Sequence, residues 1–143
     1  GNLDLKSNQV VSVEGLGNLT GLTHLILWDN LIEDISPLGS LINLTYLDLD
    51  TNQISNVEAM EFLTEIQVIW LITNNISDFS PLQDNEGLGA GDTIQLGNNY
   101  ATSEAASTMS LEDWCSGTGD ILGQRITFNI LGSRGANVNH DCN

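Results

Sequence analysis

The stretch Leu25-Ile26-Leu27-Trp28-Asp29-Asn30 decides the fold, because the same six-residue phrase recurs along the first half of the chain. Equivalent phrases begin at Leu3, Leu47 and Ile69. Their closing asparagines, Asn8, Asn30, Asn52 and Asn74, are spaced by 22 residues. A fixed period of this length predicts one supersecondary unit stacked on itself, which is a solenoid. A solenoid offers a broad, repetitive surface, so its usual function is to hold a partner.

Apolar residues also keep fixed offsets from each asparagine, and polar residues separate them. The offsets of two, five, eight, eleven and fourteen residues give Val10, Val13, Leu16, Leu19 and Leu22, then Ile32, Ile35, Leu38, Leu41 and Leu44, then Ile54, Val57, Met60, Leu63 and Ile66. Each unit therefore has one apolar edge, and stacking fuses these edges into a continuous core. The asparagine amide suits a buried corner, because it can bond backbone groups that a turning chain leaves unpaired.

With these residues in place, the chain resembles the leucine-rich repeat family and, more narrowly, its 22-residue class typified by bacterial internalins. The motif L-x-x-L-x-L-x-x-N-x-I-x-D-I-x-P-L-x-x-L stands nearly whole in Leu22 to Leu41, and Phe79-Ser80-Pro81-Leu82 repeats its end. The resemblance covers roughly residues 1–100. It implies an α/β solenoid: a horseshoe segment with a parallel, concave β-sheet and a C-terminal cap. It does not identify a ligand, because fold does not fix function.

A fifth phrase, Ile94 to Asn99, is displaced by three residues. We place the extra residues at Gly89-Ala90-Gly91, since insertions in repeat arrays fall in connections and glycine tolerates unusual dihedral angles there. A phosphate-binding loop is the alternative interpretation of this glycine-rich stretch. It is disfavoured because no lysine follows at the required spacing and because a strand, not a helix, comes next.

The periodicity stops at Tyr100, so we divide the chain into a repeat array over residues 1–100 and a capping region over residues 101–143. In the cap we expect a helix near Ser103 to Trp114 and a short closing strand around Val138. Cys115 and Cys142 both fall in this region, and their even number predicts a disulfide. Two reduced thiols are the alternative. The array begins directly on a strand, without a cap of its own, so we expect the chain to be part of a longer protein.

Three basic residues stand against nineteen acidic ones, a formal net charge of −16. Such a field repels nucleic acid and anionic membranes and attracts basic ligands, although a solvated acidic coat is the simpler interpretation. No apolar run is long enough to span a bilayer. With the predicted disulfide and the internalin resemblance, these features favour a secreted or cell-surface protein of bacterial type.

Strand alternation sends the side chains between the leucines to the concave surface. The three middle strands place nine residues there: His24, Ile26, Trp28, Tyr46, Asp48, Asp50, Val68, Trp70 and Ile72. Aromatic side chains are not needed for a core made of leucines, and an exposed apolar cluster usually marks a binding site. We therefore predict a protein partner here, with Asp48 and Asp50 able to pair a basic residue. In the alternative interpretation, some of these residues pack on each other or under a flanking segment.

The sequence leaves two other classes of function, an enzyme and a structural spacer. An enzyme would use His24, Asp48 or Asp50, but an open sheet excludes little water and the sequence has no nucleophile elbow, cofactor fingerprint or metal-ligand cluster. We expect no cofactor or metal, because two carboxylates are too few for calcium and His140 beside Cys142 is too little for zinc. A structural spacer in a larger surface protein is the remaining alternative. It predicts a polar concave face, which the two tryptophans oppose.

Overall fold

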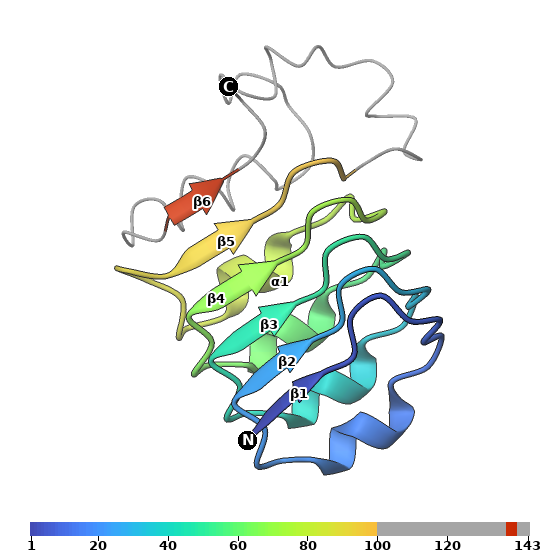
Figure 1. The fold of residues 1–143 in the computed structure, drawn as a ribbon. Helices are drawn as coiled ribbons and strands as arrows, with labels where there is room; N and C mark the ends of the chain where they lie inside the picture. Colours follow the sequence, from blue (N-terminus) through green and yellow to red (C-terminus); the bar gives the residue numbers. More distant parts are fainter. Residues whose placement is uncertain (100–136, 140–143) are drawn as a thin grey trace.

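The computed structural model describes residues 1–99 and 137–139 of the chain. Short strands form one open parallel sheet in sequence order (Figure 1). They are β1 (Asn2–Asp4), β2 (His24–Ile26), β3 (Tyr46–Asp48), β4 (Val68–Trp70), β5 (Thr93–Gln95) and β6 (Asn137–Asn139). Equivalent positions of the repeats are in register, as in the pairing of Leu3 with Leu25 and of Leu25 with Leu47. The predicted parallel solenoid is confirmed.

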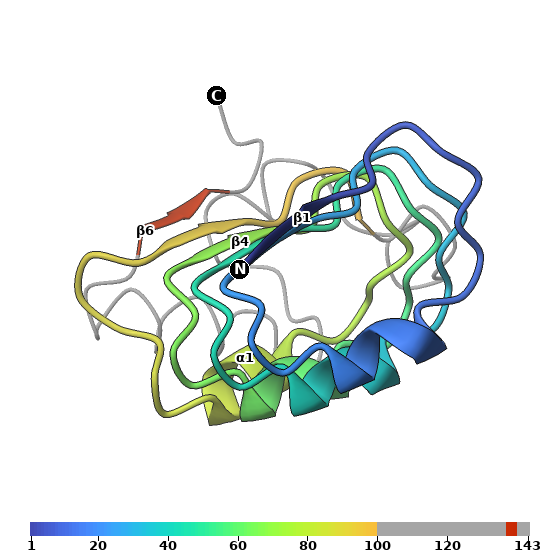
Figure 2. The ribbon, with the colours of Figure 1, turned by 60° about the horizontal axis from the view of Figure 1, so that its bottom comes forward.

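A row of short helices covers one side of the sheet (Figure 2). Three are 3₁₀ helices, η1 (Glu14–Asn18), η2 (Ser36–Ser40) and η3 (Glu58–Phe62), and the fourth is the α-helix α1 (Ser80–Asp84). Pro37 and Pro81 lie in the first turn of η2 and α1, where the fixed φ of proline suits a helix start. The other side of the sheet is called the concave face below.

The core lies between the two layers. Leu27, Leu49, Leu71 and Leu96 form a fully buried column, as the repeat predicts. Leu5, at the head of this column, is only partly buried, and Leu19 of the first repeat is exposed. Both belong to the first repeat, against whose outer side no further described repeat packs. This exposure fits an array that begins directly on a strand, without a cap of its own.

The repeated asparagines cross-link neighbouring repeats. The Oδ1 atom of Asn74 accepts the backbone N–H of Ile54 at 3.1 Å, and its Nδ2 donates to the carbonyls of Leu49 and Leu71 at 3.0 and 3.2 Å. Asn30, Asn52 and Asn99 make the same set of bonds one repeat apart and are equally buried. Asn8 differs from the prediction of a buried corner, because it is exposed in the first layer and bonds only within its own repeat.

The residue before each asparagine has a left-handed backbone. Its φ lies between 52° and 57° in every repeat, at Ser7, Asp29, Thr51, Thr73 and Asn98. Aspartate and asparagine tolerate this conformation, whereas β-branched threonine does so at a cost. No glycine marks this turn in the sequence, so the repeat pattern does not predict it. The strained backbone of this residue thus places the following asparagine at the corner of the repeat.

The displaced fifth repeat is accommodated where the sequence placed it. Leu88 still fills the last apolar column, and the N–H of Thr93 donates to the carbonyl of Gln67 as the sheet resumes. The three extra residues lie between them, with Gly91 at a φ of +97°. A hydrogen bond within the loop closes it: the N–H of Gly89 donates to Asp92 Oδ2 at 2.7 Å. This bond supports the plain-loop interpretation.

Asn85 is polar at a position where the other repeats have leucine, so the repeat pattern does not predict its role. It is fully buried, and its Nδ2 donates to the carbonyls of Met60 and Leu63 at the end of η3. Its Oδ1 accepts the N–H of Gly87. A Cβ at Gly87 would lie 1.9 Å from the carbonyl oxygen of Thr64, so only glycine fits there. This asparagine and glycine let α1 pack against η3 before the longer loop begins.

The expected closing strand around Val138 is confirmed as β6, which pairs in parallel with β5. The predicted helix near residues 103–114 and the Cys115–Cys142 disulfide lie outside the described residues. The division of the chain at residue 100 also stays a prediction.

Replacing Asn74 with alanine should lower the free energy of unfolding by about 2 kcal/mol, because the buried N–H of Ile54 loses its acceptor. The carbonyls of Leu49 and Leu71 each lose one donor and keep a second one, from Asn52 and Asn99. Asn8→Ala is the matched control, since the same residue type in the first layer is exposed. It should lose less than about 1 kcal/mol in chemical denaturation. Equal losses for the two variants would contradict the cross-linking role.

Replacing Thr51 with asparagine should stabilise the fold by about 0.5–1 kcal/mol, because asparagine adopts the left-handed conformation with less strain. Thr20→Asn serves as the control, since Thr20 is also exposed but is not among the left-handed residues. Thermal denaturation of both variants measures the difference. A Thr51 variant no more stable than the Thr20 variant would show that the turn is unstrained.

Candidate functional site

The nine residues predicted for partner binding lie together on the concave face, in three rows across β2, β3 and β4. Strand pairing sets the first two rows: His24, Tyr46 and Val68, then Ile26, Asp48 and Trp70. The third row, Trp28, Asp50 and Ile72, follows the strand ends. It stays in line because the N–H of Asp29 donates to Asp50 O at 3.0 Å and that of Thr51 to Ile72 O at 2.8 Å.

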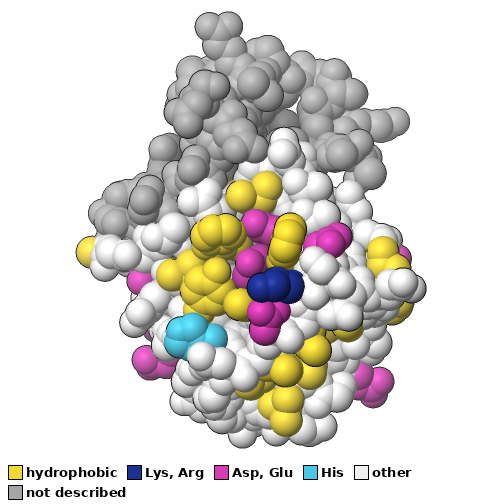
Figure 3. Space-filling view, viewed as in Figure 1, with side chains coloured by type: hydrophobic (Ala, Val, Ile, Leu, Met, Phe, Trp, Pro, Cys, Tyr) yellow, Lys and Arg dark blue, Asp and Glu magenta, His cyan; other side chains and the backbone are white. Residues whose placement is uncertain are grey.

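Apolar side chains gather near the middle of this face, beside acidic ones (Figure 3). Trp28 is 41% exposed and Trp70 is 36% exposed, so both indoles present a large apolar surface to solvent. Ile26, Val68 and Ile72 are partly exposed around them. Beneath these rows the leucines of the strands are fully buried. The tryptophans therefore add a second, outer apolar layer that the core does not require.

His24 and Tyr46 stack on each other, as the alternative interpretation of this face expects for some of its residues. Their ring centroids are 5.8 Å apart and their planes differ by 13°. The Thr23 hydroxyl lies 3.0 Å from His24 Nδ1, so the nearest polar partner of the imidazole is a hydroxyl rather than a carboxylate. The pair lines a shallow depression of about 390 Å³ that also involves Asn2, Asp4 and Ile26. The same alternation that identified the nine residues places Asn2 and Asp4 on this face.

Asp48 and Asp50 are bound to the backbone around them. Asp48 Oδ1 accepts the N–H of Asp50 at 3.1 Å, and Asp50 Oδ1 accepts the N–H of Ile72 at 2.6 Å. Asp50 is only 9% exposed, although the sequence placed it on an open surface. Its carboxylate bonds the backbone of the next repeat at Ile72, and it stands in its row between the large residues Trp28 and Ile72.

Burial changes the acid–base properties of this group. Loss of solvent raises the pKa of Asp50 to about 6, against the opposing effect of the Ile72 hydrogen bond and with a smaller contribution from the Asp48 charge. Burial also raises the pKa of Asp48, and it raises that of Tyr46, where both carboxylates add to the effect. Near neutral pH, the ionised carboxylate of Asp50 therefore lowers the stability of the folded chain.

Lys6 and Asp4 form the one ion pair found within the described part of the chain, with Lys6 Nζ 3.2 Å from Asp4 Oδ2. Both side chains are about half exposed, so the pair contributes little to stability. A backbone hydrogen bond from Lys6 lowers the pKa of Asp4, and the side-chain hydrogen bond and the charge of the same lysine lower it further. Asp48 and Asp50 receive no such cation from residues 1–99.

Within the described residues, no three histidine, cysteine or acidic side chains are grouped so as to hold a metal ion. No helix in the same part of the chain is long and apolar enough to cross a membrane.

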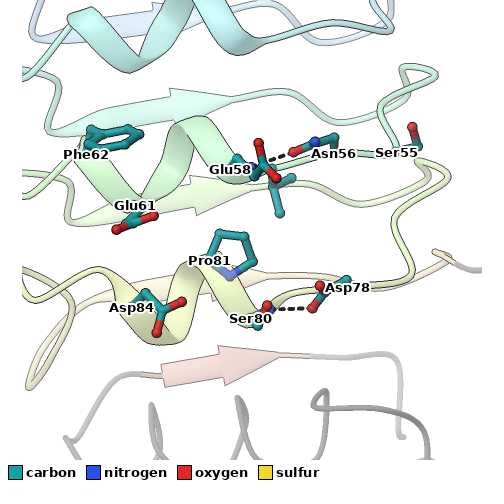
Figure 4. A pocket seen from close by; sticks show the side chains of 10 residues that line it. Ser55, Asn56, Glu58, Glu61, Phe62, Asp78, Ser80, Pro81 and Asp84 are labelled. Carbon is teal, nitrogen blue, oxygen red and sulfur yellow. Dashed lines mark hydrogen bonds between the residues drawn. The ribbon is translucent and has the colours of Figure 1, made fainter.

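A second depression, of about 420 Å³, lies on the helical side between η3 and α1 (Figure 4). It is lined by acidic residues and by Phe62. Two of its polar side chains bond the backbone: Asp78 Oδ1 accepts the N–H of Ser80 at 2.8 Å, and Asn56 Oδ1 accepts that of Glu58 at 2.7 Å. Asp34 makes the same bond at the start of η2. Because this arrangement recurs at helix starts along the array, it is a structural element of the repeat.

Residues 20–61 match the family model of leucine-rich repeats in two copies. The crystal structure of internalin C2 from Listeria monocytogenes is similar to the chain, with a TM-score of 0.64 and 33% identity over 75% of this chain and 46% of that one. An internalin designated inlF from the same organism has a TM-score of 0.63 and 28% identity over 73% of this chain and 36% of that one. The chain thus spans less than half the length of either internalin. No curated protein is significantly similar to it.

Replacing Asp50 with asparagine should stabilise the fold at pH 7 by on the order of 1 kcal/mol. The pKa of Asp50 is higher in the folded chain than the 3.8 of an exposed aspartate, so the folded state binds the proton more tightly. Stability therefore falls as the pH rises from about 4 through 6, and the gain from asparagine should shrink towards pH 4.

Denaturation of both proteins at pH 4 and pH 7 measures this effect. Glu61→Gln removes the same charge from an exposed position of η3 and controls for net charge. A gain that is equal for the two variants, or independent of pH, would show that burial of Asp50 is not its cause.

Proposed function

We propose that the chain is a protein-recognition module that binds its partner on the concave face. The premise is that the chain belongs to the leucine-rich repeat family and that its repeats are internalin-like. The proposal assigns the contact to the three rows of the candidate site. No covalent chemistry is part of the function.

The exposed indoles are the observation that carries the proposal. Trp28 and Trp70 stand on adjoining rows, above strands whose leucines are already fully buried. The core excludes water without the two indoles, so exposing them on the surface does not stabilise the fold. Tryptophan and tyrosine are also the residues most often found at the energetic centre of protein interfaces. A structural spacer, the alternative left by the sequence, has no use for such a surface.

Charge indicates the kind of partner. A net charge of −16 favours a protein with a basic surface, and it opposes nucleic acid. Long-range attraction of this type mainly raises the association rate, and it weakens as salt is added. The internalin-like repeats further support a secreted or cell-surface location, in which the partner is an extracellular protein.

Capture on the immobilised chain, with mass spectrometry of the bound material, identifies the partner, and its affinity for variants then tests the site. Trp28→Ala and Trp70→Ala should each weaken binding by about 2 kcal/mol, or roughly thirtyfold, because hot-spot aromatics lose their buried contact area. Folding should be nearly unchanged, since an exposed side chain adds little to stability.

Phe62→Ala is the matched control, because Phe62 is an aromatic residue that is 57% exposed on the helical side. It should bind as the wild type does. A large loss of thermal stability in the tryptophan variants, with binding unchanged, would identify the indoles as packing residues and refute the proposal.

A further inference from the structure

The centre of the concave face has a regular arrangement of charge and aromatic surface. Asp48 stands between Ile26 and Trp70 in its row, and Asp50 stands between Trp28 and Ile72 in the next one. Neighbouring strands of a sheet lie about 4.8 Å apart. Asp48, the last residue of β3, and Asp50, two residues further along the chain, face the same side of the sheet. One indole borders the pair on the β2 side and the other on the β4 side.

Asp50 lacks a counter-charge at this position. It is 9% exposed, and its Oδ1 accepts the N–H of Ile72. Its Oδ2 has no hydrogen-bond donor among residues 1–99, and the amino group of Lys6 is paired with Asp4. An ionised carboxylate accepts several hydrogen bonds, and burying it without a cation is unfavourable. Burial raises the pKa of Asp50 to about 6, and no cation of residues 1–99 pairs with its carboxylate to oppose that shift.

The surroundings determine which cation suits the site. A metal ion is poorly served, because calcium needs six to eight oxygen ligands and no third acidic, histidine or cysteine side chain of the described chain joins the pair. Two flanking indoles instead favour an organic cation, which is attracted to an aromatic face. A guanidinium group is planar, stacks on aromatic rings and bonds a carboxylate with two parallel N–H groups.

We infer that the Asp48–Asp50 pair, bordered by Trp28 and Trp70, is a socket for an arginine side chain of the partner protein. The inference rests on the proposed function and specifies the chemistry of its central contact. The two indoles supply the apolar area of the interface. The two carboxylates favour a cationic side chain of the partner at the position between the indoles.

A titration with N-acetyl-arginine methylamide, followed by NMR of the indole N–H signals of Trp28 and Trp70, tests the socket without the partner. N-acetyl-citrulline methylamide has nearly the same shape without the charge, and N-acetyl-lysine methylamide has the charge without the planar group. We expect saturable shifts of both indole signals with the arginine probe, weaker binding of the lysine probe and no saturable shift with citrulline.

Two charge-matched variants locate the effect. Asp50→Asn keeps the oxygen that accepts the N–H of Ile72 but removes the charge, and it should weaken binding of the arginine probe about tenfold. Glu58→Gln removes one charge from an exposed position on the helical side and should leave binding unchanged. Equal effects of the two variants, or equal binding of arginine and lysine, would overturn the inference.

The captured partner separates this inference from the function on which it rests. Loss of partner binding in both Trp28→Ala and Asp50→Asn supports the two together. If Trp28→Ala abolishes binding and Asp50→Asn does not, the concave face is the interface but the socket is refuted. If neither variant affects partner binding, the proposed function fails irrespective of the probe titration.

Discussion

The buried asparagine at the corner of each repeat is the interaction on which the rest of the structure depends. One side chain satisfies a backbone N–H of the preceding repeat and carbonyls of both repeats, as Asn52 does for Ile32, Leu27 and Leu49. Stacking thus gives these backbone groups of the corner a partner that the turning chain alone does not supply. These bonds keep equivalent positions in register from strand to strand. That register aligns the side chains of the concave face into rows. The buried asparagines therefore determine which side chains stand next to each other on the concave face.

Much of this could be predicted from the sequence, because the repeat imposes the same geometry each time. The 22-residue spacing predicted the parallel sheet and the leucine column, and alternation placed Trp28 and Trp70 outward. What was missed depends on neighbours in space. The burial of Asp50 follows from bulky residues one strand away, and Asn85 is polar at a position that the pattern reserves for leucine. The left-handed turn before each asparagine has no marker residue in the sequence.

Stability and recognition make opposite demands on the concave face. The helical side uses its polar side chains locally, where Asp78 and Asn56 bond the first turns of α1 and η3. On the sheet side, two indoles remain exposed and Asp50 holds a partly unsatisfied charge. None of these features stabilises the isolated chain. A surface that gains from being covered by a cationic, apolar partner accounts for all of them together.

Hydroxyl-radical footprinting of the chain, free and bound to its captured partner, tests the central claim most directly. The method reports on exposed aromatic side chains, and the chain provides them on both sides: Trp28 and Trp70 on the concave face and Phe62 on the helical face. If the concave face is the recognition surface, the partner protects both tryptophans from oxidation and leaves Phe62 as reactive as in the free chain. Protection of Phe62 with undiminished oxidation of the tryptophans would contradict it.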